Sequence, residues 1–200
     1  MAGGFVFVVG PSGAGKDSLI GAAKTALQGD PRFIFPRRVV TRPSSSAEEH
    51  DTLDEATFAT LEADGRFTLA WRAHGHCYAI PGSALDAVLG GAIAVCNISR
   101  RVVPWARLHL PRVTVVEVTA PIEVLHARLV ARGRADDGDL TGRLARSRQV
   151  WTEVDHSIVN DGPLEPAADD LVRCIRAHGG DATAPLQEHR VKQRLVFRFL

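Results

Sequence analysis

The stretch Phe5-Val6-Phe7-Val8-Val9-Gly10-Pro11-Ser12-Gly13-Ala14-Gly15-Lys16-Asp17-Ser18 decides the fold of this 200-residue chain. Its five leading apolar residues predict a buried strand, and the glycine-rich segment that ends in lysine leads into a helical pattern. Glycines let backbone N–H groups turn inward around phosphate oxygens, and the N-terminus of the following helix adds positive potential. The stretch therefore predicts a phosphate-binding loop, the P-loop, between a strand and a helix.

The residue after the P-loop lysine departs from the usual pattern. A Ser or Thr normally follows this lysine, and its hydroxyl holds Mg²⁺. Here Asp17 takes that place and Ser18 comes next. Either side chain could hold the metal, and the sequence leaves the choice open.

Composition narrows the class of protein. A hydrophobic content of 45% in 200 residues predicts one α/β domain with a sizeable core. The net charge of +1 argues against bulk nucleic-acid binding. Cys77, Cys96 and Cys174 lack the spacing of a disulfide framework or a zinc site. Without a basic leader or a long apolar run, we expect a cytoplasmic protein with no membrane partner.

Short β-branched or aromatic runs alternate with helical patterns along the chain. The predicted strands are residues 5–9, 37–41, 92–96, 113–118 and 157–159, and the predicted helices are residues 16–27, 82–89, 121–131 and 140–150. This order is typical of βαβ units in a three-layer P-loop NTPase fold with a central parallel sheet. Ligands of such folds lie at the carboxyl ends of the strands.

Arginines supply the cations that phosphoryl transfer needs. Arg42 ends a predicted strand, where it is suited to bind an acceptor phosphate with both guanidinium nitrogens, although a solvated edge charge is an equal alternative. Arg132 and Arg143 bracket a polar loop, a layout typical of a lid that closes over ATP phosphates. Lys16, Arg42, Arg132 and Arg143 are the predicted catalytic residues.

Taken together, these motifs resemble the guanylate kinase-like P-loop family. The resemblance rests on the P-loop, the Thr41-Arg42-Pro43 strand end, the hinge before Arg143 and the segment 158–161. Within that family, the segments 15–19, 38–43, 49–50, 71–75, 78–81 and 97–100 are most similar to ribose 1,5-bisphosphate phosphokinases. The resemblance implies ATP- and Mg²⁺-dependent phosphorylation of ribose 1,5-bisphosphate to 5-phospho-α-D-ribosyl 1-diphosphate.

Motif and resemblance together define the expected site. ATP is expected to contact Gly10, Pro11, Ser12, Gly13, Ala14, Gly15, Lys16, Asp17, Ser18, Asn160 and Asp161, with Asp17 or Ser18 on the metal. The sugar phosphate is expected to contact Arg38, Arg42, Glu49, His50, His74, Tyr78, Asn97, Ser99 and Arg100. The kinase domain is predicted to span residues 1–178, with an acceptor lobe at about 36–81 and a lid at about 132–143. Residues 179–200 form an extension of unknown role.

Two departures separate the chain from true guanylate kinases. Leu69 aligns with the glutamate that reads guanine in those enzymes, and a leucine cannot accept hydrogen bonds from guanine N1 and N2. An Asp-x-Asp pattern is replaced by Asn97-Ile98-Ser99-Arg100, which suits a more anionic acceptor. The alternatives are a guanylate or other nucleoside monophosphate kinase and a noncatalytic guanylate kinase-like binding module.

Other polar and aromatic residues have several possible roles. His74 and His76 are placed in a loop without a third metal ligand, so His74 is expected to contact either the acceptor or the backbone. Trp71 and Tyr78 are expected to pack within the acceptor lobe, and Glu117 to be the buried partner of an arginine. The alternating segment 191–199 fits an edge strand or an interface segment, which leaves a homodimer open.

Overall fold

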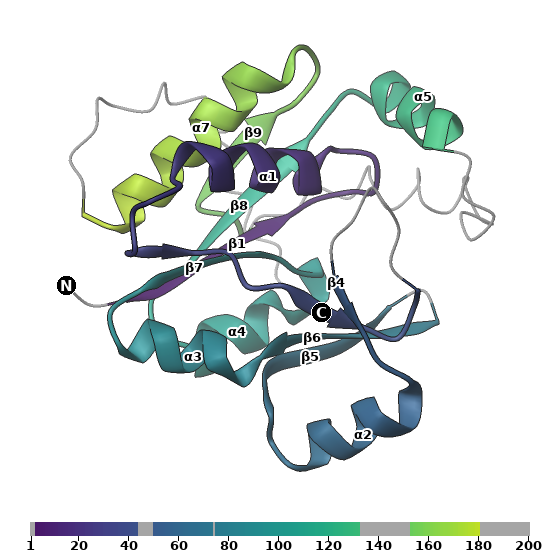
Figure 1. Cartoon of the computed structure of the whole chain (residues 1–200). Coiled ribbons are helices and arrows are strands. Elements are labelled where there is room, and N and C mark those ends of the chain that lie inside the picture. Colours follow the sequence, from purple (N-terminus) through teal and green to yellow (C-terminus); the bar gives the residue numbers. More distant parts are fainter. Residues whose placement is uncertain (1–2, 44–49, 74, 133–152, 181–200) are drawn as a thin grey trace, which may run out of the picture.

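A five-stranded sheet forms the centre of the computed structural model (Figure 1), which describes residues 3–43, 50–73, 75–132 and 153–180. In spatial order its strands are β2 (Phe33–Ile34), β7 (Ile93–Asn97), β1 (Gly4–Val9), β8 (Val113–Thr119) and β9 (His156–Val159). Every neighbouring pair is parallel. The predicted central parallel sheet is confirmed.

Helices cover both faces of this sheet (Figure 1). One face carries α1 (Lys16–Ala26) and α7 (Leu164–His178), and the other carries α3 (Gly82–Leu89) and α4 (Val103–His109), which follows the 3-10 turn η1 (Arg100–Val102). Helix α5 (Ile122–Arg132) follows β8. All six residues of β1 are buried, because a strand covered on both faces needs apolar side chains at every position. The predicted three layers are therefore present.

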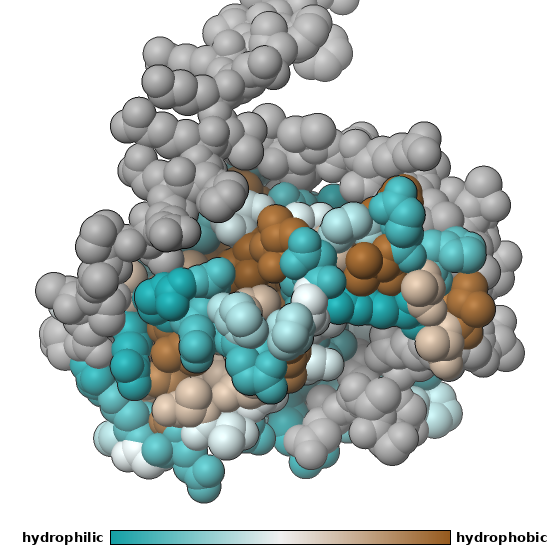
Figure 2. Space-filling view, turned by 90° about the horizontal axis from the view of Figure 1, so that it is seen from above, coloured by the Kyte–Doolittle hydropathy of each residue, from teal (hydrophilic) through white to brown (hydrophobic). Residues whose placement is uncertain are grey.

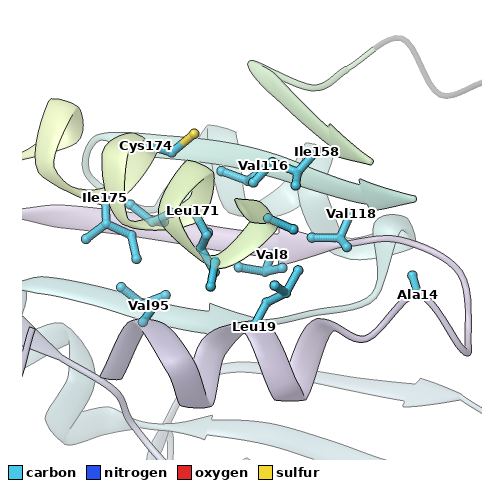
Figure 3. Close-up of a cluster of buried hydrophobic side chains, with 14 of the residues drawn as sticks. Val8, Ala14, Leu19, Val95, Val116, Val118, Ile158, Leu171, Cys174 and Ile175 are labelled. Carbon is cyan, nitrogen blue, oxygen red and sulfur yellow. The ribbon is translucent and has the colours of Figure 1, made fainter. Parts of the chain in front are cut away.

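The core beneath α1 and α7 shows why the P-loop is firmly placed. Val8 and Val116 from the sheet pack against Leu19 of α1 and Leu171 of α7, and all four are fully buried (Figure 3). Burying a side chain of this size stabilises the fold by about 1.5–3 kcal/mol. This packing holds the end of β1 and the start of α1, the two elements that the P-loop connects.

A second, four-stranded sheet stands beside the first. Its strands, in spatial order, are β4 (His50–Thr52), β3 (Arg38–Val40), β6 (His76–Pro81) and β5 (Phe67–Ala73). Helix α2 (Glu55–Ala63) is capped at its N-terminus by Asp54, whose side chain accepts a hydrogen bond from the Thr57 amide at 2.8 Å. Phe58 of α2 packs on Val39 and Ala79 of the second sheet.

The predicted elements and the observed ones differ mainly in this second sheet. The strand expected at 37–41 is β3, which pairs with β4 and β6 and not with the central sheet. The loop expected around His76 is wrong, since His76 opens β6 directly after Gly75, which has a φ of 74°. Strands β2, β4, β5 and β6 and helices α2, α4 and α7 were not predicted. The helix expected at 140–150 and the segment 191–199 lie outside the described residues.

The face of the molecule seen in Figure 2 carries small hydrophobic areas separated by hydrophilic ones. Within the described part of the chain, no helix has the length and apolar character needed to cross a membrane. Cys96 and Cys174 are buried, and burial raises the pKa of Cys96 to about 12 and that of Cys174 to about 11. Both side chains therefore stay neutral thiols and act as small core residues.

Candidate nucleotide and acceptor site

The P-loop closes around its own lysine. The Lys16 Nζ donates hydrogen bonds to the carbonyl oxygens of Gly10 at 3.0 Å and Pro11 at 2.8 Å. Gly10, Gly13 and Gly15 all have positive φ, at 139°, 85° and 86°. Only glycine adopts such angles without strain, so the sequence folds here into a ring of backbone around a cation. The lysine lies where a phosphate chain would enter.

Two of these glycines are also required by close packing. A Cβ at Gly10 would lie 2.0 Å from the Val118 carbonyl oxygen, and one at Gly15 would lie 2.4 Å from Asn160 Nδ2. Both distances are far below van der Waals contact. The loop therefore lies directly against the ends of β8 and β9.

Asn160, directly after β9, supports the P-loop through hydrogen bonds. Its Nδ2 donates to the Ala14 carbonyl at 2.8 Å, and its backbone N–H donates to the Thr119 carbonyl at 2.8 Å. Arg128 of α5 donates from Nη1 to the Asn160 carbonyl at 2.9 Å. The asparagine side chain is buried, while the neighbouring Asp161 is exposed. The contacts tie three elements to the phosphate-binding loop, and a contact with adenine stays a prediction.

Asp17 lies against the end of β7. Asn97 Nδ2 donates a hydrogen bond to Asp17 Oδ1, and the Arg38 guanidinium lies 3.7 Å from the same oxygen. Residue Ser18, the other candidate for the metal, is exposed on α1. The helix therefore turns Asp17 toward the sheet and Ser18 toward solvent.

A second charged pair spans the end of β1, because Arg100 follows β7 and Glu117 lies on β8. Glu117 of β8 is in register with Val9, the last residue of β1, and its Oε1 lies 3.8 Å from Arg100 Nη1. Burial raises the pKa of Glu117, and the Arg100 charge opposes that rise. The expected arginine partner of Glu117 is confirmed as Arg100, and the Glu117 side chain is half-buried.

The second sheet faces this region with aromatic and cationic groups. Tyr78 and Trp71 stack with ring centroids 5.5 Å apart, and the Arg38 guanidinium lies 6.0 Å from the Tyr78 ring centre. The expected packing of Trp71 and Tyr78 within this lobe is confirmed. Arg38 thus reaches from the second sheet to Asp17 on α1, so it links the two halves of the site.

Arg42 and His50 are joined by a hydrogen bond. The Arg42 carbonyl accepts hydrogen bonds from His50 Nε2 at 2.9 Å and Thr52 Oγ1 at 3.2 Å. His50 is buried, and its Nδ1 has no partner among the described residues. In this structure His50 positions the backbone at the end of β3, and its contact with an acceptor stays a prediction.

The structure brings part of the predicted site together. Arg38, Asp17 and Asn97 meet beside the P-loop, and Arg100 lies in η1 directly after Ser99, whose side chain caps that turn. Arg132 ends α5, and nothing is described of its side chain. Glu49, His74 and Arg143 lie outside the described residues, as does most of the predicted lid. No cluster of three or more metal-ligating side chains occurs in the described ranges.

Sequence reasoning missed two supporting roles. Arg128 of α5 holds the Asn160 backbone, a role that no sequence motif indicated. Thr41 Oγ1 accepts a hydrogen bond from the Cys77 amide at 2.9 Å, which fixes the strand end that carries Arg42. Neither role has a local signal in the sequence, because each partner is supplied by a distant element.

Comparison with known proteins gives the family. The chain is 55% identical over 177 residues to ribose 1,5-bisphosphate phosphokinase PhnN of Methylobacterium radiotolerans, an overlap that covers 88% of this chain and 99% of the relative. It is 49% identical to the protein of the same name from Rhodopseudomonas palustris, covering 88% and 90%. No protein-family model matches the sequence.

Solved structures agree on the fold. A guanylate kinase from Anaplasma phagocytophilum superimposes with a TM-score of 0.66 at 21% identity, covering 89% of this chain and 87% of that one. A sugar kinase from Janibacter superimposes with a TM-score of 0.52 at 16% identity, covering 91% and 99%. The predicted guanylate kinase-like fold is confirmed. Because the relatives match over nearly their whole length, the chain belongs to the ribose 1,5-bisphosphate phosphokinase family.

Proposed function

We propose that this protein is a kinase that transfers the γ-phosphoryl group of ATP to the 1-phosphate of ribose 1,5-bisphosphate. The products are ADP and 5-phospho-α-D-ribosyl 1-diphosphate. The observation that carries the proposal is the 55% identity to a relative named ribose 1,5-bisphosphate phosphokinase, over 99% of that relative's length. A cytoplasmic location would supply the ATP, and such a product fits a role in phosphonate breakdown.

The site geometry supports phosphoryl transfer. Lys16 can exchange its two carbonyl partners for phosphate oxygens without leaving the loop. The acceptor phosphate already carries negative charge, so no strong general base is needed, and catalysis rests on position and charge neutralisation. Arg38 and Arg42 would hold the acceptor, and Arg132 and Arg143 would close over ATP.

A divalent cation fits the residues beside Lys16. Mg²⁺ prefers hard oxygen ligands, and Asp17 supplies a carboxylate there. The Oδ1 of Asn97 is buried and has no partner among the described residues. When bound, Mg²⁺ would neutralise charge on the ATP phosphates. Asp17 and Asn97 would hold it, and Lys16 would position the same phosphates.

The apolar setting of Leu69 supports a sugar phosphate over GMP. Leu69 is buried and pairs with Ile80 in the antiparallel register of β5 and β6. A guanine placed there would leave its N–H donors unpaired, at a cost of about 1–3 kcal/mol each. This cost opposes the nucleoside monophosphate alternative.

The deciding experiment offers the enzyme ATP and Mg²⁺ with ribose 1,5-bisphosphate, GMP, AMP or gluconate in separate assays. ADP release is followed by a coupled assay, and the product is identified by ³¹P NMR. We expect turnover with the bisphosphate alone and a new diphosphate signal. Turnover with GMP would contradict the argument that Leu69 excludes guanine. No ADP release with any acceptor would favour a noncatalytic binding module.

Lys16→Ala tests the P-loop assignment. We expect turnover to fall by about 100-fold or more, because a cation aimed at the transferred phosphoryl group is lost. Lys24→Ala removes an exposed lysine from the last turn of the same helix and serves as the matched control. Circular dichroism checks that both variants fold. An active, folded Lys16→Ala enzyme would refute the assignment.

A further inference from the structure

Glu117 is the one carboxylate in the five strands of the central sheet, all of which lie in the described ranges. The Arg100 guanidinium, at 3.8 Å from Glu117 Oε1, is too distant for a hydrogen bond, and no other described group donates one to this carboxylate. A half-buried carboxylate without hydrogen-bond donors loses solvation that nothing in the described chain replaces. Such a group can receive its donors from a ligand.

The residue pattern of β8 places Glu117 on the face of the central sheet that meets the second sheet. Side chains alternate between the two faces of a strand. Val116 and Val118 belong to the core beneath α1 and α7, whereas Val115 belongs to the core shared with the second sheet. Val9, the last residue of β1, is in register with Glu117 and lies in that shared core. The carboxylate therefore lies near the carboxyl ends of the strands, where ligands of such sheets bind.

Glu117 and Arg100 match two different parts of a sugar phosphate. A phosphate oxygen accepts hydrogen bonds, so it suits the Arg100 guanidinium and is repelled by the Glu117 carboxylate. A sugar hydroxyl can donate a hydrogen bond, so it suits the carboxylate. Acidic side chains bind ribose hydroxyls in this way in dinucleotide-binding folds. Of the groups on a pentose bisphosphate, the hydroxyls are therefore the ones that fit Glu117.

We propose that Glu117 is a specificity-determining residue that accepts hydrogen bonds from the cis hydroxyls at C2 and C3 of the acceptor pentose. Its two oxygens can each accept from one of two adjacent hydroxyls. The Arg100 charge favours the ionised carboxylate beside the ligand. This inference rests on the proposed function for the identity of the acceptor.

Two sugars that differ only in the C2 hydroxyl test the proposal. The readout is the ratio of the Kd for 2-deoxyribose 1,5-bisphosphate to the Kd for ribose 1,5-bisphosphate. Both are measured by isothermal titration calorimetry with ADP present, so no turnover occurs. We expect a ratio of about 30 in the wild type, because the deoxy sugar lacks a hydrogen bond to a charged group.

Variants at Glu117 show whether this residue causes the preference. Glu117→Met removes the carboxylate at similar volume, and the ratio should fall to about three or less. Glu117→Gln keeps one accepting oxygen without the charge, and the ratio should fall to about five. Glu123→Met removes an exposed carboxylate from the first turn of α5 and should leave the ratio unchanged. Melting temperatures show that each variant is folded.

Two results would overturn the proposal. If Glu117→Met weakens the binding of both sugars equally and keeps the wild-type ratio, the carboxylate acts only by holding Arg100. Equal Kd values for the two sugars in the wild type would show that the C2 hydroxyl is not bound.

The same titrations keep this proposal apart from the proposed function. If the wild type phosphorylates ribose 1,5-bisphosphate while the ratio is insensitive to Glu117, the role of Glu117 fails and the kinase activity stands. If the ratio follows the expected pattern while ATP gives no phosphorylated product, the sugar site stands and the proposed reaction fails. If neither sugar binds, the acceptor assignment fails and this inference fails with it.

Discussion

At the scale of single residues, the buried side-chain amides of two asparagines hold the P-loop and Asp17 in place by hydrogen bonds. The Nδ2, the backbone N–H and the carbonyl of Asn160 each form a hydrogen bond with a different part of the chain: the P-loop, β8 and α5. Asn97 likewise fixes Asp17. An amide suits both places, because it donates a hydrogen bond without the desolvation cost of a buried charge.

Asn160→Ala is the residue-scale test of this role. The change leaves the Ala14 carbonyl without its donor, so we expect the free energy of unfolding to fall by about 1–3 kcal/mol. A less ordered P-loop should also weaken ADP binding by about tenfold. Calorimetry and thermal melts measure both effects. Ser157→Ala, at an exposed position of β9, is the control, and an unchanged Kd in Asn160→Ala would contradict the bracing role.

At the scale of elements, the end of α7 carries a histidine that is held neutral. Burial lowers the pKa of His178 to about 4, with Arg112 acting in the same direction and Asp155 opposing. A helix C-terminus favours a cation, but burial outweighs that effect here. Thr114 Oγ1 lies 2.8 Å from His178 Nδ1 and joins α7 to β8.

This histidine predicts a pH dependence of stability. Well above pH 6.5 the ring is neutral in both the folded and the unfolded chain, so it adds no slope. Between pH 6.5 and about 4 the unfolded chain binds a proton that the folded chain does not. The free energy of unfolding should therefore fall with falling pH, by about 1–2 kcal/mol after allowance for partial exposure of the ring.

Denaturant titrations at pH 7.5 and pH 4.5 measure this loss. In His178→Gln the part of the loss that belongs to His178 should disappear, whereas His126→Gln, at an exposed position on α5, should keep it. An identical loss in His178→Gln and the wild type would show that other groups cause it.

At the scale of the whole molecule, one core joins the two sheets. Phe7 of β1 belongs to the same buried cluster as Trp71 and Tyr78 of the second sheet. Phe58, by contrast, lies in a small separate cluster between α2 and the second sheet. The larger core therefore sets the position of the second sheet relative to the P-loop.

Phe7→Ala and Phe58→Ala compare these two cores with the same chemical change. Both residues are almost fully buried. We expect Phe7→Ala to lower the global free energy of unfolding by about 3–5 kcal/mol, as large truncations in a main core do. Phe58→Ala should cost less and should raise amide exchange mainly in residues 38–81. Uniform exchange in both variants would show that the second sheet does not open separately.

The strand, loop and helix of residues 5–18 could be predicted from the sequence, because their information is local. An apolar run, glycines with positive φ and a lysine at fixed spacing describe a P-loop without reference to the rest of the chain. The order of strands and helices was enough for the central parallel sheet, since such patterns allow few topologies.

Only the tertiary structure decided how the site is assembled. Asn97 and Asp17 are 80 residues apart and meet because β7 pairs with β1 in one particular register. The same kind of register brings Glu117 of β8 within reach of Arg100. Strands β4, β5 and β6 escaped prediction because they mix polar and apolar residues, and β3 finds its partner β6 far along the chain. Long-range pairing of this kind leaves no periodic signal in the sequence, whereas the P-loop carries its geometry in consecutive residues.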